Sequence, residues 1–570
     1  MVESMDRAWT PAEVWEGYDP TEEPLDEEVL REWTEDGVRY RELYFTGETW
    51  EGHPVRAYAM YAAPVGGQEL PGVLHIHGGG QTVNPQWLSF WADRGYAAMS
   101  FNWGGEWPNR ERITLWGPLV QGNHQQSNHN LVSPTPRVNS WYHWTLVSRR
   151  ALTCLERQAE VDPDRLGVFG TSMGGTIMWN LALDRRIRAG CAVYGVGWDT
   201  YREQPKFATG LPKPEANPGT LRWRSSIAPE AYAPLVRFPM LFMSATNDHH
   251  GNMDRAYDTL ALMPEGVPRR QAFTPRCRHH IGADFAEDLP LWMDAWLRHG
   301  EPWPETPGTS LAIGADGVPL LTVTPDDPPD VARVEAYYAV ENLSAISRNW
   351  RAADLRQDGQ GLVARLPVMD VGKYVFAFAN VHYGNGVCLS SRLEAGIPAE
   401  LGDARATDAP SLMICDGSDG TGSWVTQSPS TDPIPPIRIP IRRETAPDGR
   451  SGFSPFQHCS PLTYQVGDPK WRGPEGARLT FDVFSRERDD FAVALHVRPF
   501  LIGFQEYHAK VELKGAGEWE RVELSAGQFI STSDASPLAD WNSVEMLELR
   551  VPEGGWSDER IVFTHFQWVE

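Results

Sequence analysis

Hydrophobic and polar positions follow two different periods in the first three hundred or so residues of the chain. Residues 36–63 alternate between apolar and polar side chains, as is typical of an antiparallel pair of strands. From there to about residue 300, short apolar runs alternate with stretches of helical spacing. This alternation predicts an α/β fold, in which a mostly parallel sheet carries helices on both faces.

One helix is predicted from its apolar face. Between residues 139 and 158 the large apolar side chains recur at helical spacing and share one face: Trp141, Trp144, Val147, Ala151, Leu152 and Leu155. We expect this helix to pack on the sheet immediately before the next strand.

The pattern changes after the proline-rich residues 301–307. Short β-rich runs follow, and a second proline-rich stretch at about 400–450 leads into strands that continue to the C-terminus. A chain of 570 residues exceeds one compact core. The predicted divisions are an acidic N-terminal extension (1–34), the α/β domain (35–303), an immunoglobulin-like β-sandwich (304–400) and a jelly roll (401–570).

Residues 165–175 carry the most specific motif. An apolar strand runs directly into Gly-Thr-Ser-Met-Gly at residues 170–174, and Gly175 follows. A serine between a strand and a helix, flanked by glycines that let two backbones pass closely, is the sequence form of a nucleophile elbow. The motif predicts that Ser172 is the nucleophile of a serine hydrolase.

A glycine-rich turn upstream fits the same chemistry. Residues 72–81 form an apolar strand that ends in His-Gly-Gly-Gly. In such sheets a backbone N–H from this turn and the N–H after the nucleophile hold the oxyanion that develops during acyl transfer. Gly79, Gly80 and Met173 are the predicted donors.

The acid of a catalytic triad is expected after a later strand, because this arrangement presents Ser, then acid, then His. The apolar run 239–245 is followed closely by Asp248, which we predict to orient the imidazole. A strand-end aspartate is otherwise usually a helix N-cap, and Asp248 precedes a plausible helix. Asp199 is the reserve acid.

The general base is expected beyond the last strand, predicted at 269–275. Two adjacent histidines follow, and we favour His279 because His280 with Ile281 resembles the first turn of a helix. His280 stays an alternative. His249 and His250 are predicted to be solvated turn residues, because adjacent histidines point in different directions and no zinc-ligand spacing accompanies them. The predicted two-step acyl transfer needs no metal and no cofactor.

Two long irregular stretches, 103–138 and 198–236, are predicted to roof the pocket, since loops of this length in a compact domain are usually functional. Flat aromatic rings suit the faces of sugars. The predicted substrate-binding residues of the first stretch are Trp103, Trp107, Trp116 and His124.

These motifs resemble the α/β-hydrolase superfamily over about residues 35–300. Within it, Val-Asp-Pro-Asp-Arg at 161–165 and Ser-Met-Gly-Gly at 172–175 resemble dienelactone-hydrolase-like and acetyl-xylan-esterase-like enzymes. The resemblance implies a carboxylesterase, commonly one that acts on acylated carbohydrate. The elbow holds serine rather than cysteine, so the dienelactone reaction itself is not expected. Strand patterns at 517–524, 537–541 and 546–549 resemble galactose-binding-like carbohydrate modules.

Two other functions remain open. The cocaine-esterase and X-prolyl-peptidase group also joins this fold to a C-terminal jelly roll, but its elbow usually has an aromatic residue where this chain has Met173. A non-catalytic binding protein on a hydrolase fold is the second alternative, although such relatives typically lose a member of the triad.

Composition narrows the partners. The 51 basic against 76 acidic residues give a formal charge of −25, which disfavours nucleic acid and anionic membranes as partners. The six widely spaced cysteines are expected to be reduced core thiols. No apolar run approaches the length of a membrane span, and the first residues do not resemble a secretory signal. The hydrolase motifs and the resemblance imply a small-molecule or carbohydrate ester as the partner. The expected location is the cytoplasm, or outside it if a signal has been removed.

Overall fold

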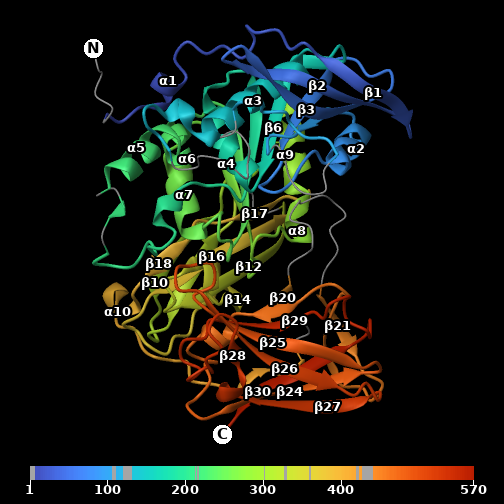
Figure 1. The fold of residues 1–570 in the computed structure, drawn as a ribbon. Coiled ribbons are helices and arrows are strands. Elements are labelled where there is room, and N and C mark those ends of the chain that lie inside the picture. The colour runs from blue at the N-terminus through green and yellow to red at the C-terminus, as the bar shows by residue number, and fades with distance from the viewer. Residues whose placement is uncertain are drawn as a thin grey trace.

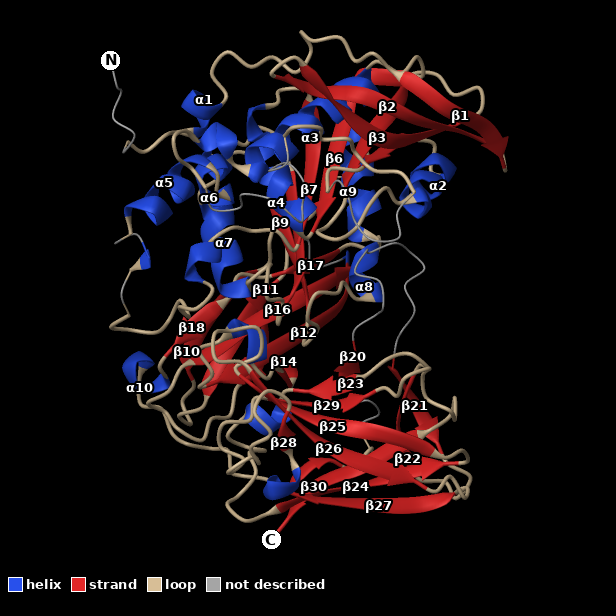
Figure 2. Ribbon diagram, in the orientation of Figure 1, coloured by secondary structure: helices blue, strands red, loops and turns tan. Residues whose placement is uncertain are grey.

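A computed structural model describes residues 7–104, 111–119, 131–211, 213–214, 217–300, 302–326, 330–358, 361–418, 423–426 and 441–570. Figure 1 shows three successive parts, with the first sheet and its helices at one end and the C-terminal strands at the other. Figure 2 shows that most helices surround the first sheet, whereas the other two parts consist mainly of strands.

The first part is built on a nine-stranded sheet of order β1-β2-β3-β5-β4-β6-β7-β8-β9. Its first strands pair antiparallel, and the run β5-β4-β6-β7-β8-β9 is parallel throughout. The strands are β1 (Glu28–Glu35), β2 (Val38–Trp50), β3 (His53–Pro64), β4 (Leu70–Ile76), β5 (Ala97–Phe101), β6 (Val161–Thr171), β7 (Ile187–Val193), β8 (Met240–Ala245) and β9 (Arg269–Thr274). The structure thus confirms the α/β prediction and the antiparallel pair expected at 36–63.

The helices cover both faces of this sheet, as a parallel sheet requires. Buried side chains of α3, α4, α6 and α7 share one core with one face, and those of α2 and α9 share another with the opposite face. The helices are α1 (Pro11–Val14), α2 (Pro85–Asp93), α3 (Ser140–Glu156), α4 (Met173–Asn180), α5 (Pro218–Ser226), α6 (Pro229–Tyr232), α7 (Met253–Ala261), α8 (Ala283–Ala286), α9 (Asp288–Leu297) and, later in the chain, α10 (Pro398–Leu401). No described helix is both long and apolar enough to cross a membrane.

The N-terminal segment packs on the first part of the molecule. β1 begins at Glu28 and pairs with β2. The guanidinium of Arg150, which is buried on α3, donates to the carbonyl oxygens of Pro20, Glu23 and Pro24. This covering layer explains why α3 is buried nearly all round rather than on the one face that its apolar spacing indicates.

The second part consists of two antiparallel sheets with a shared core. One holds β10 (Gly308–Ile313), β11 (Pro319–Thr324), β15 (Gly361–Arg365) and β14 (Leu355–Asp358); the other holds β13 (Arg351–Ala353), β12 (Val331–Val340), β16 (Val375–Tyr383), β17 (Cys388–Ser390) and β18 (Glu394–Gly396). This part covers the edge of the first sheet. Ser390 accepts from the backbone N–H of Phe273 on β9 at 2.8 Å, so the edge strand is not left open.

The third part has its own core and two further sheets, of order β21-β22-β30-β24-β27 with β19 paired to β30, and β20-β23-β29-β25-β26-β28. Their strands are β19 (Met413–Cys415), β20 (Val425–Thr426), β21 (Ile441–Thr445), β22 (Ser451–Pro455), β23 (Pro461–Thr463), β24 (Arg478–Ser485), β25 (Asp489–Val497), β26 (Gln505–Leu513), β27 (Glu518–Ser525), β28 (Ile530–Ser531), β29 (Met546–Arg550) and β30 (Val562–Val569). All described strand pairs here are antiparallel, which confirms the all-β prediction. The exact domain boundaries and the sandwich and jelly-roll types stay predictions.

Candidate active site

Ser172 occupies the sharp turn between β6 and α4. Its backbone lies at φ 57° and ψ −117°, a region that is strained for any residue with a side chain. Its backbone N–H donates to the carbonyl oxygen of Val193 at 2.8 Å, which fixes the turn against β7. The Ser172 side chain makes no capping hydrogen bond to α4, so its hydroxyl is not used to satisfy the helix. The residue is partly exposed at the carboxyl end of a parallel strand, where such sheets bind ligands.

The glycines around Ser172 are required by close backbone contacts. A Cβ atom on Gly170 would overlap the carbonyl oxygen of Gly174, and one on Gly174 would overlap that of Ile76 on β4. A Cβ on Gly175 would lie 2.5 Å from the carbonyl oxygen of Val193. The motif therefore has the physical origin that the sequence indicates, since no other residue lets strand and helix pass so closely.

Replacing Gly174 by alanine is expected to destabilise the protein, because the added methyl group meets backbone atoms that cannot rotate away. Overpacking of this kind costs about 3 kcal/mol, which corresponds to a fall in Tm of roughly 2–5 °C for a chain of this size. Gly527→Ala is the matched control, since nothing lies within 4 Å of the added atom there. Thermal unfolding followed by circular dichroism measures both variants, and an unchanged Tm for Gly174→Ala contradicts this account of the turn.

Asp248 and His279 form a hydrogen-bonded pair beside this turn. Asp248 follows β8, His279 follows β9, and Nδ1 of His279 lies 2.5 Å from Oδ2 of Asp248. The second carboxylate oxygen accepts the backbone N–H of His250 at 2.7 Å and also that of Gly251. Asp248 does not cap the following helix, because the N-cap of α7 is Asn252. The carboxylate thus holds the ring of His279 in place.

The electrostatics of Asp248 favour its charged form. Complete burial alone raises the pKa of this carboxyl, but the charge and hydrogen bond of His279, with smaller contributions from His249 and the Gly251 amide, outweigh burial and lower the pKa from 3.8 to about 2. The side chain is therefore ionised at neutral pH.

This shift predicts a pH-dependent stability. A carboxyl whose pKa is lower in the folded protein stabilises it above the unfolded pKa, and this stabilisation disappears as the pH falls through the folded pKa. Asp248 is expected to contribute about 2 kcal/mol that is present above about pH 4 and lost towards pH 2. Urea unfolding of wild type and Asp248→Asn across this window measures it. The difference between their free energies of unfolding must shrink as the pH falls, and a constant difference contradicts the shift.

His250, rather than His279, is the imidazole within reach of the Ser172 hydroxyl. Its Nδ1 lies 3.5 Å from Oγ of Ser172, and its Nε2 lies 3.0 Å from Oγ1 of Thr176. The prediction that His250 is a solvated turn residue is wrong, since its side chain is buried. Because Asp248 binds the N–H groups of His250 and Gly251, the turn after β8 folds back towards the serine. Burial, the largest effect, lowers the pKa of His250, so its ring is neutral near pH 7.

The two halves of the predicted triad are therefore close but not joined. A catalytic triad joins the serine and the acid through one histidine ring. Among the described residues, His279 is hydrogen-bonded to Asp248 but not to Ser172, whose hydroxyl lies nearest His250. The rings of His250 and His279 are 6.2 Å apart, and that of His279 lies 4.1 Å from Tyr194. A serine side chain has three staggered positions, and catalytic hydrogen bonds often tighten only once substrate is bound.

The alternative acid and base lie elsewhere. Asp199 is in the short helix η5 (Asp199–Tyr201) and pairs with Arg202 at 3.3 Å. The sequence favours His279 because His280 is predicted to lie in the first turn of a helix. That prediction is wrong, since α8 begins only at Ala283 and the buried His280 precedes it. It is nevertheless His279 that the structure places against Asp248.

The glycine-rich turn after β4 lies against the serine. A Cβ on Gly78 would lie 3.2 Å from Cβ of Ser172, and the N–H of Gly78 donates to Oε1 of Gln81 at 2.7 Å. The next residue, Gly79, is exposed, and Gly80 has φ +70°. The amide of Gly78 is thus engaged by Gln81, and Gly79 and Gly80 stay the predicted donors of this turn. Met173 supplies the first amide of α4, at an end where helix N–H groups lack partners within the helix. The oxyanion roles stay predictions.

The structure corrects the expected role of Trp103. The indole is fully buried, stacks on His77 with ring centroids 4.9 Å apart, and donates to the His77 carbonyl oxygen at 2.9 Å. It therefore supports the glycine-rich turn and has no face left for substrate. Trp116 is likewise in the core. Trp107 and His124 lie outside the described residues, as does much of 103–138. The stretch 198–236, expected to be irregular, contains α5 and α6.

A metal could in principle use Asp248, His249 and His279, whose ligand atoms lie within 4.8 Å of one another. The direct contact of 2.5 Å between Asp248 and His279 argues for a hydrogen bond. Two ligand atoms on one tetrahedral zinc lie roughly 3.4 Å apart.

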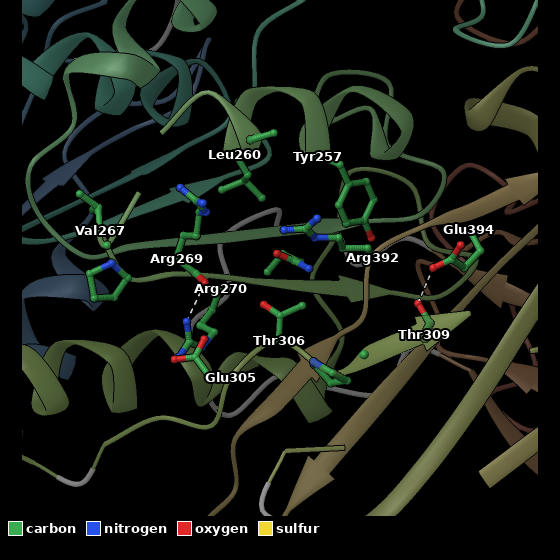
Figure 3. Close-up of a pocket in the computed structure, with 16 residues that line it drawn as sticks. Tyr257, Leu260, Val267, Arg269, Arg270, Glu305, Thr306, Thr309, Arg392 and Glu394 are labelled. Carbon is green, nitrogen blue, oxygen red and sulfur yellow. Dashed lines mark hydrogen bonds and ion pairs between the residues drawn. The ribbon is translucent and has the colours of Figure 1, made fainter. Parts of the chain in front are cut away.

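A cavity of about 620 Å³ is lined by none of these site residues, and Figure 3 shows the side chains that line it. Arg269, Arg392 and Tyr257 line it together with residues 305–309 of the second part. It adjoins the amino end of β9, whereas His279 follows the carboxyl end. Active sites of parallel sheets lie at carboxyl ends, so this cavity is not the candidate catalytic site.

Taken together, the parallel strand order, the strained serine between strand and helix, and the acid and histidine after later strands define an α/β-hydrolase fold. No protein-family model matches the sequence, and comparison with curated proteins finds no match.

Solved structures with similar folds include esterases. The acetyl xylan esterase from Paenibacillus sp. R4 is 19% identical, with a TM-score of 0.40, over 49% of this chain and 91% of that chain. Acetyl xylan esterase 1 from Thermoanaerobacterium sp. is 18% identical, with a TM-score of 0.37, over 48% and 87%. A putative dienelactone hydrolase from Klebsiella pneumoniae is 16% identical, with a TM-score of 0.32, over 46% and 100%.

Proposed function

We propose that this protein is a serine hydrolase that cleaves carboxylic esters. The observation that carries the proposal is the placement of Ser172, strained and partly exposed at the N-terminus of α4, beside the pair formed by buried Asp248 and partly exposed His279. Strained backbone at a serine whose hydroxyl caps nothing is typical of a nucleophile that the surrounding fold holds ready.

The proposed mechanism has two steps. In the first, Oγ of Ser172 attacks the ester carbonyl carbon while Nε2 of His279 accepts the hydroxyl proton, and Asp248 stabilises the imidazolium. The N–H groups of Met173 and Gly79 hold the oxyanion. The C–O bond to the alcohol then breaks, and the alcohol leaves with the proton from His279. In the second step, water attacks the acyl-enzyme by the same route and releases the acid and free serine.

Acylated carbohydrate is the proposed substrate class, following the resemblance to acetyl-xylan-esterase-like enzymes. The all-β third part favours X-prolyl-peptidase or cocaine-esterase-like hydrolysis as the second candidate, because that group also carries a C-terminal β domain. A binding protein without catalysis is disfavoured by the presence of serine, histidine and acid together.

A substrate panel tests the proposal. Purified protein is assayed with p-nitrophenyl esters, acetylated sugars and aminoacyl anilides, with Ser172→Ala as the control for background hydrolysis. Turnover of esters that depends on Ser172 supports a carboxylesterase, and preference for acetylated sugars supports the narrower class. Turnover of the anilides alone favours the peptidase, and no turnover of any substrate contradicts the proposal.

A further inference from the structure

The loop between β25 and β26, residues 498–504, reaches the catalytic site from the third part of the molecule. The ring of Phe500 stacks on that of His249, with centroids 4.7 Å apart and planes 9° from parallel. The ring of His249 in turn lies 5.0 Å from that of His279. A residue more than two hundred positions beyond the triad is therefore one imidazole away from the proposed general base.

The loop is held against the first part by polar contacts. The backbone N–H of Ile502 donates to a carboxylate oxygen of Glu203 at 2.8 Å, and Arg498 lies 3.9 Å from the same carboxylate. The guanidinium of Arg278, next to His279 in sequence, lies 5.5 Å from the centroid of the Phe500 ring. Glu203 belongs to the stretch 198–236 that is predicted to roof the pocket. The loop and this stretch thus meet beside the catalytic histidine.

The backbone of the loop is strained. Arg498 and Phe500 have φ values of 51° and 62°, which side-chain-bearing residues rarely adopt, and Gly503 has φ 82°. Two such residues within three positions persist only where the surroundings hold them, and they cluster at ligand sites.

Apolar side chains on the loop stay exposed despite these contacts. Phe500 is 42% exposed and Ile502 is 73% exposed. A contact that served only to dock the third part would bury these side chains, because burial is what makes apolar contact favourable. Exposed apolar groups beside an active site are instead typical of a surface that a ligand covers.

We propose that residues 498–502 of this loop form a wall of the substrate site and that Phe500 is a specificity-determining residue for esters carrying a large apolar group, above all an aromatic ring. This rests on the proposed ester hydrolysis and adds a large apolar group to the acylated carbohydrate proposed as its substrate. The aromatic group belongs either to the acyl part or to the alcohol part of the ester. Both place a flat apolar group against the exposed face of Phe500.

Kinetics with paired esters test the proposal and show whether the aromatic group belongs to the acyl part or to the alcohol part of the ester. Methyl acetate is the small reference, benzyl acetate carries the ring on the alcohol, and methyl 3-phenylpropionate carries it on the acyl group. Phe500→Ala is expected to lower kcat/KM about five- to tenfold for one of the aromatic esters and to leave methyl acetate within about twofold. Phe504→Ala is the matched control, because it removes the same ring from the same loop but from a position stacked on His496 of the third part.

A binding measurement keeps this test independent of turnover. NMR titration of Ser172→Ala protein with the two aromatic esters is expected to show, for the ester whose kcat/KM falls, a Kd about five- to tenfold weaker when Phe500→Ala is added. If no variant hydrolyses esters but this difference in Kd is found, the proposed function is wrong, whereas the proposed role of the loop in ligand binding is supported. Equal losses on methyl acetate and the aromatic esters, or aromatic kcat/KM and Kd unchanged by Phe500→Ala, overturn the proposal. A lowered Tm with uniform loss of activity assigns Phe500 a purely structural role and also overturns it.

Discussion

Ser172→Ala is expected to abolish ester hydrolysis, with a loss of kcat/KM on the order of 10⁴- to 10⁶-fold. The alanine removes the only group that forms the covalent acyl-enzyme in the proposed mechanism. What remains is the weak acceleration from binding and from the oxyanion donors. Initial rates on the best ester of the panel, with purified variant and wild type at matched concentration, measure the loss.

The fold should not change with this substitution, because the Ser172 hydroxyl caps no helix and its neighbours are fixed by backbone contacts. Ser89→Ala is the control for removal of a hydroxyl, since Ser89 lies on α2 and donates to carbonyl oxygens of the first turn of the same helix. Its activity should stay within about twofold of wild type. Activity of Ser172→Ala within about tenfold of wild type contradicts the serine mechanism, because binding and the oxyanion donors alone cannot sustain so high a rate.

His279→Ala is expected to cost nearly as much as Ser172→Ala, on the order of 10⁴-fold or more in kcat/KM. Only this imidazole is oriented by the buried carboxylate of Asp248, which stabilises the positive charge that the ring acquires. His250→Ala is the sharpest comparison, because His250 lies nearer the Ser172 hydroxyl but makes no ion pair with a carboxylate among the described residues. We expect a loss of about tenfold for it, from a misplaced hydroxyl.

His280→Ala completes the series and should lose less than His279→Ala. The ranking decides which ring is the base, measured as kcat/KM with one ester and checked by Tm for each variant. A larger loss for His250→Ala than for His279→Ala moves the base to His250. In that case the Asp248–His279 pair is structural.

The order of the site residues along the chain could be predicted because the local backbone around each of them determines the residue type. Gly170 and Gly174 are needed where two backbones pass within overlap distance of a Cβ, and Asp248 and His279 follow the carboxyl ends of buried strands. These features depend on a few neighbouring residues, and hydrophobic patterns mark where each strand ends.

The rest depends on contacts between distant segments, which no local pattern contains. Trp103 follows a strand end, as a pocket residue would. Its ring nevertheless stacks on His77, 26 positions earlier, and donates to the carbonyl oxygen of that residue. The sequence around His250 is typical of a solvated turn. The carboxylate of Asp248 accepts hydrogen bonds from the backbone N–H groups of His250 and Gly251, and these bonds place His250 in the interior. Phe500 meets His249 only because a loop of the third part reaches the first.

Covalent labelling tests the central claim, that Ser172 is an activated nucleophile, most directly. Wild-type protein is treated with a fluorophosphonate, which phosphonylates activated serines, and the modified peptide is identified by mass spectrometry. The account predicts one adduct, on Ser172, with loss of esterase activity in proportion to labelling and no adduct in Ser172→Ala. An adduct on another residue, or folded protein that hydrolyses esters while Ser172 stays unlabelled, would contradict it.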